Sequence, residues 1–319
     1  MKAQSVEKPV RVLQVLHNLK KGGVQADTIY PVRTLPRSSL TCDVLLLSNT
    51  EGELESEFCQ YGRIFRIPVE RGKHKISRLA RVWLNPFVVY RQTLLFLREN
   101  KPYDAVHVRH MMFIAPCLMA AKRAGVPVRI GHSHVNAPEG ERLYVRLYLK
   151  LCGKIIARCA TLKLGVTKDA CRYLFGNDNT SRVIKTPTVD LAKFCPAKYP
   201  KCKHEGLSLI QVGSFGSRKN QAFTLEVLSA LRKRDTDARL TLIGYSQPGS
   251  DIMTILESKI AALGLAEHVS FLPSDANIAE AMAASDVMIL PSLQEGLPNT
   301  ALEAQAMGLP CFLATAVSD

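Results

Sequence analysis

The amino-acid sequence predicts an α/β protein made of two doubly wound, parallel-sheet domains. Short runs rich in Val, Ile and Leu alternate with longer amphipathic stretches along the whole chain, which is typical of βαβ units. A segment rich in proline and lysine, residues 186–206, interrupts this pattern once. We therefore expect a first Rossmann-like domain at residues 1–186, a linker at 187–206 and a second Rossmann-like domain at 207–319.

The expected strands are short and apolar. In the first domain they are Val10–Leu16, Asp43–Leu47, Ile64–Val69, Ala105–Val108, Val126–Ile130 and Leu162–Val166. In the second they are Leu207–Val212, Leu240–Ile243, Val269–Leu272, Val287–Leu290 and Cys311–Leu313. Helical periodicity is clearest at Ala222–Arg234, Asp251–Leu263 and Asn277–Ala284. The second series stops soon after its last strand, so we expect a truncated domain that lacks the final elements of a complete doubly wound sheet.

Charge is distributed unevenly along the chain. Residues 1–190 hold 31 Lys and Arg against 15 Asp and Glu, whereas residues 191–319 hold 11 against 13. This asymmetry favours different partners for the two domains. Phosphorylated substrates and anionic membrane surfaces fit the basic half. Nucleic acid fits least well, because the basic residues are not interleaved with aromatic ones and no nucleic-acid-binding motif is visible.

Cysteine usage and hydropathy bear on the compartment. The nine cysteines form no C-x-x-C pair, which is typical of reduced cytosolic thiols. The N-terminus lacks the apolar region of a signal peptide. The longest charge-free apolar stretch, Met111–Ala121, is shorter than the roughly 20 residues that span a bilayer. We expect a cytoplasmic protein, whose basic half allows peripheral binding to the inner face of the cell membrane.

The stretch "SLQEGLPNTALEAQAMGLP" begins just after the expected strand Val287–Leu290. Pro298 suits the first turn of a helix, where its missing N–H costs nothing. Glu295, Gly296 and Leu297 are therefore expected at the carboxyl end of a parallel strand, where open α/β sheets bind ligands. The Gly296 and Leu297 amides at the helix start favour a phosphate there.

Charged side chains on both expected loops fit a nucleotide sugar. Glu303, one to two turns into the helix, suits a ribose diol, and Glu295 can reach a sugar hydroxyl. Arg218 and Lys219 follow the strand Leu207–Val212, where a diphosphate needs cations. The alternative is that these are ordinary solvated or helix-surface charges.

These motifs, in this order, resemble the C-terminal domain of the retaining GT-B glycosyltransferases of family 4, the group 1 glycosyltransferases. The stretches "LIQVGSFGSRKN", "LTLIGYSQPG" and "VSFLPSDANIAEAMAASDVMILPS" precede the two-glutamate stretch in the family's own order. The most specific combination runs from Ser285 to Gly308. The resemblance implies two Rossmann-like domains with a cleft between them, and it is closest to bacterial capsule and exopolysaccharide transferases.

The first domain also resembles this family. Gly22 and Gly23, in "LQVLHNLKKGGVQ", match the family's Gly-rich loop facing the donor. His132, in "VPVRIGHSHVN", matches its active-site histidine. Leu272 corresponds to the loop near the nucleotide base.

The sequence departs from the family pattern at several positions. The family's phosphate-binding arginine is Ser214 here, and Arg218 is a candidate substitute. The base-side F-x-G reads Phe271-Leu272-Pro273, and an H-x-H motif reads His107-Val108-Arg109-His110. These departures bear on the strength of donor binding more than on the fold.

The resemblance implies a metal-independent hexosyltransferase that acts with retention. Its donor would be a nucleotide sugar, with UDP favoured, and its acceptor a lipid-linked or polysaccharide molecule in surface polysaccharide synthesis. His132 and Glu295 are the expected catalytic residues. Lys219 and Arg218, with the Gly296 and Leu297 amides, would stabilise the departing diphosphate. No cofactor is expected.

Two motifs imitate metal sites. Asp235-Thr236-Asp237 has the form of the D-x-D motif of other glycosyltransferases, but it lies between a helix and a strand and is interpreted as a solvated turn. His132 and His134, with Glu139, suggest zinc only weakly, because H-x-H without further ligands is not a site.

One surface feature does not depend on the resemblance. The basic residues Arg142, Arg146, Lys150, Lys154 and Arg158 recur every four positions, which forms a stripe on a helix. Leu143, Leu147, Leu151 and Ile155 run beside it. This pattern fits a solvated helix face over the core. It also fits a patch that docks on anionic lipid headgroups.

Two other functions remain open. A non-catalytic or degenerate partner subunit, or a truncated gene product, is favoured by Ser214 and by the missing last elements. A nucleotide-sugar 2-epimerase shares the two-domain plan, but it would be expected to lack the E-G-x-P-x4-E-A stretch.

Overall fold

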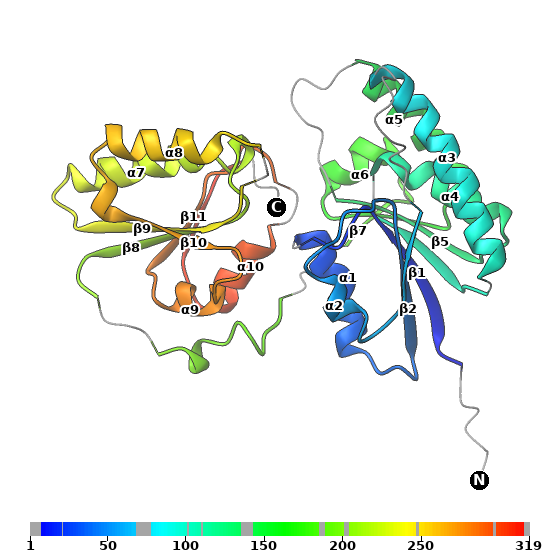
Figure 1. Ribbon diagram of the computed structural model, residues 1–319, viewed down its shortest axis with the longest axis horizontal. Helices are drawn as coiled ribbons and strands as arrows, with labels where there is room; N and C mark the ends of the chain where they lie inside the picture. Colours follow the sequence, from blue (N-terminus) through cyan, green and yellow to red (C-terminus); the bar gives the residue numbers. More distant parts are fainter. Residues whose placement is uncertain are drawn as a thin grey trace, which may run out of the picture. The chain divides into compact units, whose positions relative to one another are not determined.

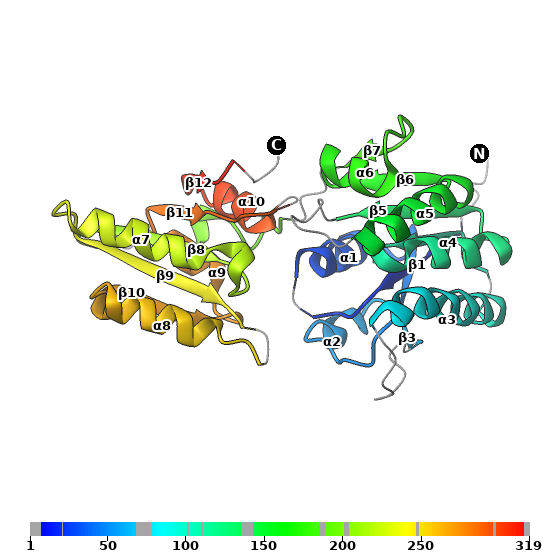
Figure 2. The same ribbon diagram turned by 90° about the horizontal axis from the view of Figure 1, so that it is seen from above.

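The computed structural model describes residues 8–20, 22–67, 78–100, 102–109, 111–134, 143–184, 189–200, 204–246, 249–295 and 298–315 (Figure 1). The chain divides into two compact units, Met1–Thr186 (unit 1) and Pro187–Asp319 (unit 2). In each unit a parallel sheet lies between two layers of helices (Figure 1, and from above in Figure 2). The predicted fold class, two doubly wound α/β domains, is confirmed.

Unit 1 contains a seven-stranded sheet in the order β3-β2-β1-β4-β5-β6-β7. Its strands are β1 (Val10–Leu16), β2 (Leu40–Leu46), β3 (Ile64–Arg66), β4 (Ala105–Val108), β5 (Val128–Ser133), β6 (Leu162–Gly165) and β7 (Arg182–Val183). All of their pairings are parallel. The strand order reverses between β1 and β4, so the loops that follow these two strands diverge at a topological switch point.

The unit 1 sheet is covered on both faces. The helices are α1 (Gly23–Thr34), α2 (Glu55–Phe58), α3 (Arg78–Glu99), α4 (Ile114–Arg123), α5 (Leu143–Cys159) and α6 (Lys168–Phe175), with a 3-10 turn at Met111–Phe113. Side chains of α1 and α2 pack with Val44 and Leu46. Side chains of α3 to α6 pack with Val106 and Val108 on the other face. Alternate residues of the strands therefore feed two separate apolar cores.

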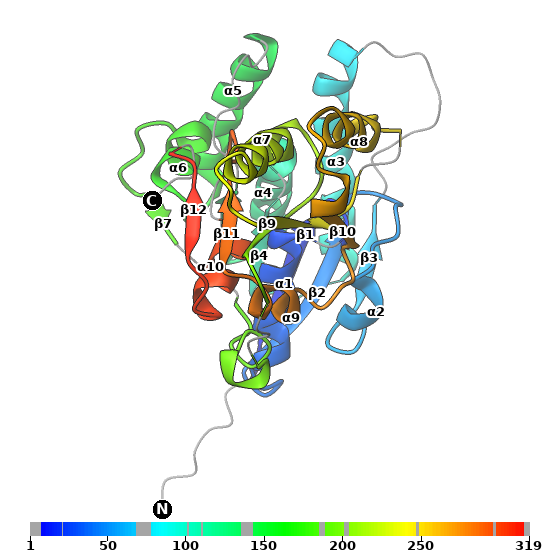
Figure 3. The same cartoon turned by 90° about the vertical axis from the view of Figure 1, so that its left-hand side faces the viewer.

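Unit 2 contains a five-stranded parallel sheet in the order β10-β9-β8-β11-β12. Its strands are β8 (Leu207–Val212), β9 (Ala238–Gly244), β10 (Val269–Pro273), β11 (Val287–Leu290) and β12 (Cys311–Leu313). The helices are α7 (Gln221–Arg232), α8 (Ile252–Ala262), α9 (Ile278–Ala283) and α10 (Asn299–Ala306), with 3-10 turns at Pro196–Lys198, Ser217–Lys219 and Ala266–His268. α7 and α8 cover one face, and α9 and α10 the other (Figures 1 and 3). The switch point lies between β8 and β11.

The strands β1, β4, β8, β11 and β12 have the predicted bounds. One difference matters for function. The strand predicted at Val126–Ile130 occupies Val128–Ser133, because its pairing with β6 continues through His132 and Ser133. His132 therefore lies within a strand and not in the loop after it. The prediction also missed β7, which is only two residues long.

Other boundaries shift for similar reasons. The strand predicted from Asp43 begins at Leu40, and the strand predicted at Ile64–Val69 ends at Arg66. Both edges follow the extent of pairing with β1 and β2. Of the helices that the structure describes, none is both long and apolar enough to cross a bilayer.

Candidate active site

An ion pair joins the two loops at the switch point of unit 2. Lys219 follows β8, Glu295 follows β11, and Lys219 Nζ lies 2.5 Å from Glu295 Oε1. Their side chains are only 12% and 11% exposed. A charged pair that is so largely removed from water interacts more strongly than a surface pair. The structure thus brings together two of the residues that the sequence singled out.

Hydrogen bonds hold these loops at fixed positions. Leu293 N donates to Arg218 O (2.9 Å), and Asn220 Nδ2 donates to Pro291 O (3.3 Å). The buried Gln211 side chain donates to Lys219 O (2.7 Å) and accepts from Thr224 Oγ1 (2.7 Å). Buried polar groups that are satisfied in this way rigidify their surroundings.

Gly213 lets the Lys219 side chain lie against the backbone. Its φ of 152° is in the region that favours glycine. A Cβ added there would lie 3.0 Å from Lys219 Cε. A Cβ on the neighbouring Gly244 would lie 2.0 Å from the Gly213 carbonyl oxygen. Gly213 therefore leaves the space that the Lys219 side chain occupies, and Gly244 lets the next strand lie close to the Gly213 backbone.

The other predicted donor-site residues of unit 2 are more exposed. Arg218 is exposed, and among the described residues its side chain forms no hydrogen bond or ion pair. Leu272 lies in the edge strand β10 with a 37% exposed side chain. Gly296 and Leu297 lie outside the described residues.

Glu303 is half-buried in α10. Burial raises its pKa to about 7, although the positive charge of Lys193 works in the opposite direction. A carboxyl group with this pKa changes charge near neutral pH, unlike an exposed glutamate.

Three histidines lie at the carboxyl end of the unit 1 sheet. His107 is in β4, His132 is in β5, and His134 follows β5 directly. His132 and His134 share one face because side chains alternate along a strand. The pairing of His107 with Ile130 puts His107 on that face too. His107 Nε2 and His132 Nδ1 are 3.2 Å apart, and the ring centroids of His132 and His134 are 4.0 Å apart.

Burial keeps these imidazoles neutral. Desolvation, with a contribution from the nearby Arg109 cation, lowers the pKa of His132 to about 3. Desolvation also lowers the pKa values of His107 and His134 well below the ordinary value. Within the described part of the chain, His132 Nε2 and His134 Nε2 are buried and have no hydrogen-bond partner. Neutral rings with a free nitrogen can donate to, or accept from, a substrate hydroxyl.

Arg109 lies beside the histidines. Its Nε donates to Gln14 Oε1 (3.3 Å) and its Nη2 to the Asp27 carbonyl oxygen (3.5 Å). Desolvation lowers its pKa to about 10, so it remains a cation at neutral pH. From the sequence, Arg109 stands out only as part of a departure from a motif. The two-residue spacing of His107 and Arg109 was the signal that both face the same side.

Gly22 and Gly23 are exposed at the start of α1. No side chain caps this helix and its first turn carries no acidic residue, so its N–H groups can meet an anion. The loop follows β1, one of the two strands at the switch point of unit 1.

The metal-like motifs differ in position. Asp235-Thr236-Asp237 precedes β9, at the amino edge of the sheet and far along the strands from Lys219, and Asp237 pairs with Arg232. Glu139 lies outside the described residues. In the part of the chain that the structure describes, no three His, Cys, Asp or Glu side chains are grouped so that they could hold a metal ion.

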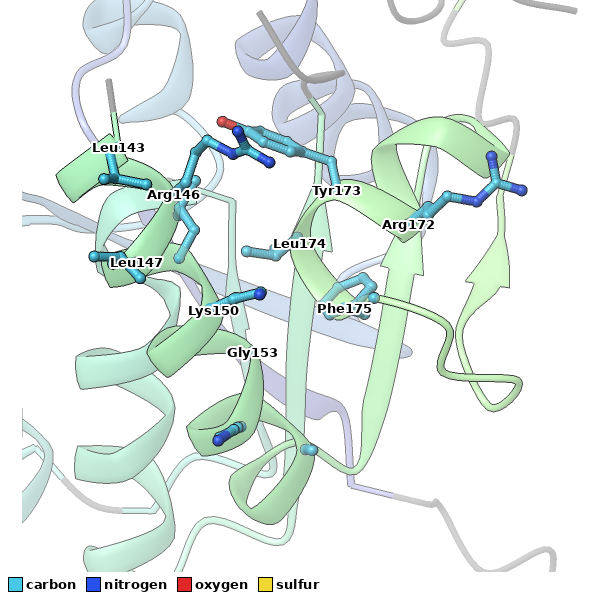
Figure 4. Close-up of a pocket in the computed structure, with 13 residues that line it drawn as sticks. Leu143, Arg146, Leu147, Lys150, Gly153, Arg172, Tyr173, Leu174 and Phe175 are labelled. Atoms are coloured by element: carbon cyan, nitrogen blue, oxygen red, sulfur yellow. The ribbon is translucent and has the colours of Figure 1, made fainter. Parts of the chain in front are cut away.

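The basic stripe lies on α5, apart from Arg142, which is outside the described residues. Leu143, Leu147 and Leu151 are 69%, 54% and 46% exposed, whereas Ile155, at the end of the row, packs against the core. A groove of about 830 Å³ runs between α5 and α6 (Figure 4). Its cations are Arg146, Lys150, Lys154 and Arg172, and none of its lining residues is acidic.

Comparison with known sequences finds one matching family and several related proteins. Residues 206–318 match the model of the family described as glycosyl transferases group 1. EpsF of Bacillus subtilis (strain 168), a candidate glycosyltransferase by name, is 31% identical over 322 residues, which cover 97% of this chain and 80% of that protein. The UDP-Gal:alpha-D-GlcNAc-diphosphoundecaprenol alpha-1,3-galactosyltransferase of Escherichia coli is 26% identical over 306 residues, covering 91% and 76%.

Solved structures share the fold. HepE of Anabaena, in complex with UDP and glucose, superposes with a TM-score of 0.76 at 20% identity, covering 97% of this chain and 81% of that one. A glycosyltransferase from Rickettsia africae ESF-5 gives a TM-score of 0.71 at 20% identity, covering 98% and 81%.

Proposed function

The chain belongs to the group 1 glycosyltransferases and has their GT-B fold, and from this premise we propose its reaction. It transfers a sugar from a nucleoside diphosphate sugar, with UDP as the favoured nucleotide, to a lipid-linked or saccharide acceptor. The transfer retains the anomeric configuration and serves surface polysaccharide synthesis.

The Lys219–Glu295 pair is the observation that carries this proposal. Its two loops meet at the carboxyl edge of the unit 2 sheet, where open α/β folds bind ligands. Lys219 supplies a positive charge for a diphosphate, and Arg218 beside it has a side chain available for the same anion. Glu295 supplies a carboxylate that can accept hydrogen bonds from sugar hydroxyls.

The proposed chemistry needs charge stabilisation above all. An acceptor oxygen forms a bond to the anomeric carbon while the bond to the diphosphate breaks. The diphosphate keeps the electron pair of the broken bond, and the acceptor hydroxyl proton is released to solvent. Lys219, which is held by its ion pair with Glu295, is a fixed donor near the departing charge, so little reorganisation is needed there during the reaction, and the exposed Arg218 side chain adds a second positive charge. In this proposal these protein cations do the work of a metal ion, and no cofactor takes part.

We assign Glu303 to the ribose hydroxyls and Leu272 to the side of the base. In unit 1 we assign His132 Nε2 to a substrate hydroxyl and the Gly22–Gly23 amides to a phosphate. Support comes from the free His132 Nε2 and the uncapped start of α1.

The relatives support the substrate classes. The Escherichia coli relative is named for a UDP-Gal donor and a diphosphoundecaprenol-linked acceptor. HepE structures contain UDP or UDP-glucose. A UDP-sugar and a lipid-linked acceptor are therefore our first choice for this chain.

Calorimetry with UDP, GDP and ADP, with and without magnesium, tests the donor site. We expect one nucleotide to bind, equally well in EDTA, and Lys219→Ala to weaken it. Lys259→Ala is the matched control, because Lys259 forms an ion pair with Glu226 between α7 and α8, elsewhere in unit 2. Binding that requires magnesium would contradict metal independence, and no binding at all would contradict the donor site.

A non-catalytic partner subunit is the second candidate, because Ser214 replaces the family's phosphate-binding arginine. It would bind nucleotide without turnover. Release of nucleoside diphosphate from UDP-glucose and UDP-galactose, in the presence of isolated bacterial lipid-linked saccharides, separates the two functions.

We also propose that α5 faces an anionic membrane. The helix carries four basic and no acidic residues, and its exposed leucines lie beside them. Basic and apolar side chains on one surface suit the boundary between lipid headgroups and acyl chains. This surface would bring the enzyme to a lipid-linked acceptor on the inner face of the membrane.

Co-sedimentation with phosphatidylglycerol vesicles tests the membrane surface. We expect binding that falls in high salt and that is weakened several-fold by Arg146→Glu with Lys150→Glu. The matched control is Lys233→Glu with Arg234→Glu, an equal charge change at exposed residues of unit 2. If both double variants lost vesicle binding equally, the binding would depend on net charge alone, which would contradict a specific membrane surface on α5.

A further inference from the structure

The two buried histidines of β4 and β5 form a hydrogen-bonded pair. His107 Nε2 and His132 Nδ1 are 3.2 Å apart. The two ring planes are inclined by only 8°, with centroids 5.3 Å apart. Nearly parallel planes at this separation let the N–H of one ring point along the lone pair of the other. The contact is therefore directional and not only a van der Waals contact.

The sheet fixes this contact. His107 pairs with Ile130 across β4 and β5, and His132 is two residues further along β5 on the same face. Both strands are interior to the sheet and paired on both sides. The two rings consequently have little freedom to move apart.

The pair leaves one nitrogen of His132 for a substrate. Nδ1 is occupied by His107, whereas Nε2 is buried and, within the described residues, unpartnered. Because both rings are neutral, each carries a single proton. A hydrogen bond at Nδ1 therefore decides whether Nε2 carries the proton.

We propose that His107 is a positioning residue that holds the His132 ring and fixes its tautomer, so that Nε2 alone meets a substrate hydroxyl. This inference rests on the proposed role of His132. No other described side chain has a hydrogen bond to the His132 ring. The neighbouring Arg109 is directed by Gln14 and the Asp27 carbonyl instead.

Two substitutions separate this role from packing. His107→Leu keeps an apolar volume in a buried position but removes the hydrogen bond. His107→Gln keeps an amide group that can reach His132 Nδ1. We expect kcat to fall by about tenfold to a hundredfold in His107→Leu, with little change in donor KM, because a loosened catalytic group is misplaced by a fraction of an ångström or more. His107→Gln should recover most of the loss. Equal activities of the two variants would overturn the proposal.

Nitrogen NMR of the imidazoles tests the same inference without turnover. In the wild-type protein His132 should show one fixed tautomer, with one protonated and one unprotonated ring nitrogen. In His107→Leu the two nitrogens should average towards each other. The ring nitrogens of His204, which is exposed in unit 2, should give the same signals in both proteins. An averaged His132 in the wild type would overturn the proposal even if transfer is confirmed. A fixed tautomer in a protein without transferase activity would uphold the pair and contradict the proposed function.

Discussion

The switch points of the two sheets have the same topology, but the side chains gathered near them differ in chemistry. In unit 1, β1 and β4 are neighbours where the strand order reverses, and in unit 2, β8 and β11 are. Beside this point, on β4 and β5, unit 1 gathers neutral, desolvated imidazoles together with the buried Arg109 cation. Unit 2 gathers the Lys219–Glu295 ion pair and the exposed Arg218. Topology thus provides the place for a ligand, and the side chains on the loops decide what kind of group each place suits.

The overall charge of the two halves suggests the reverse arrangement. Unit 1 is strongly basic and unit 2 is nearly neutral, yet the charged site is in unit 2. Much of the unit 1 charge is on helix surfaces such as α5. Net charge therefore points to the partners of a surface, whereas a reaction site depends on a few partly buried groups.

His132→Phe should give the largest effect. We expect turnover to fall by about a hundredfold or more, because the substrate hydroxyl that His132 holds is misplaced, while nucleotide affinity stays unchanged. Steady-state rates and calorimetry on the same preparation check this. If nucleotide affinity fell as much as turnover, His132 would bind the nucleotide, which would contradict its assignment to a substrate hydroxyl.

Lys219→Ala should weaken nucleotide binding by about tenfold to a hundredfold, because a charged hydrogen bond to the diphosphate is lost and Glu295 loses its cation. Calorimetric titration measures this. Asp235→Asn, at the opposite edge of the same sheet, should leave the affinity within about twofold. An equal effect of both changes would contradict a site at the carboxyl edge.

Glu303 should make nucleotide binding depend on pH. Its pKa of about 7 means that the carboxyl group becomes negatively charged as the pH rises. A carboxylate accepts hydrogen bonds from ribose hydroxyls better than the protonated acid does. We expect binding by the wild type to tighten by up to about tenfold from pH 6 to pH 8. In Glu303→Gln this part of the pH dependence should vanish, and a persistent dependence would assign it to another group.

The two units should respond in opposite directions to mild acid. The histidines of unit 1 have lowered pKa values, so below the ordinary value of about 6.5 the unfolded chain binds protons that the folded unit does not, and stability falls as the pH falls. Glu303 has a raised pKa, so its contribution to unit 2 stability is lost as the pH rises through about 7.

Calorimetric unfolding at pH 7 and pH 5 measures this effect. Each fully buried histidine contributes at most about 1.4 kcal/mol per pH unit. The single tryptophan, Trp83, belongs to unit 1, so tryptophan fluorescence comes from that unit alone. His132→Phe should make the pH dependence of the unit 1 transition shallower. If the pH dependence of the transition is unchanged in this variant, His132 has the same pKa in the folded and unfolded states.

Sequence periodicity was enough to predict the fold and most strand positions, because buried parallel strands read as short apolar runs. It was less informative where pairing sets the boundary. His132 was expected after a strand, and only the continued pairing with β6 places it inside one. The roles assigned to the site residues remain predictions.

Contacts between distant residues could not be predicted. The sequence pointed to Lys219 and Glu295 separately, but their ion pair depends on how two loops meet in space. The His107–His132 bond likewise joins residues 25 positions apart. Helical spacing alone also does not say which apolar residues are covered: Leu143 and Leu147 are exposed, whereas Leu149 and Ile156 of the same helix lie in the core.

Gly213 sets a limit on how this chain can drift in evolution. Any side chain there would meet the Lys219 methylenes, and the backbone conformation itself favours glycine. Gly244, on the next strand, faces the carbonyl oxygen of Gly213, and it too has no room for a Cβ. In a library that varies these positions, we expect almost no residue other than glycine to be accepted at 213 or 244. Gly216, three residues from Gly213 and with open space around it, should accept many replacements.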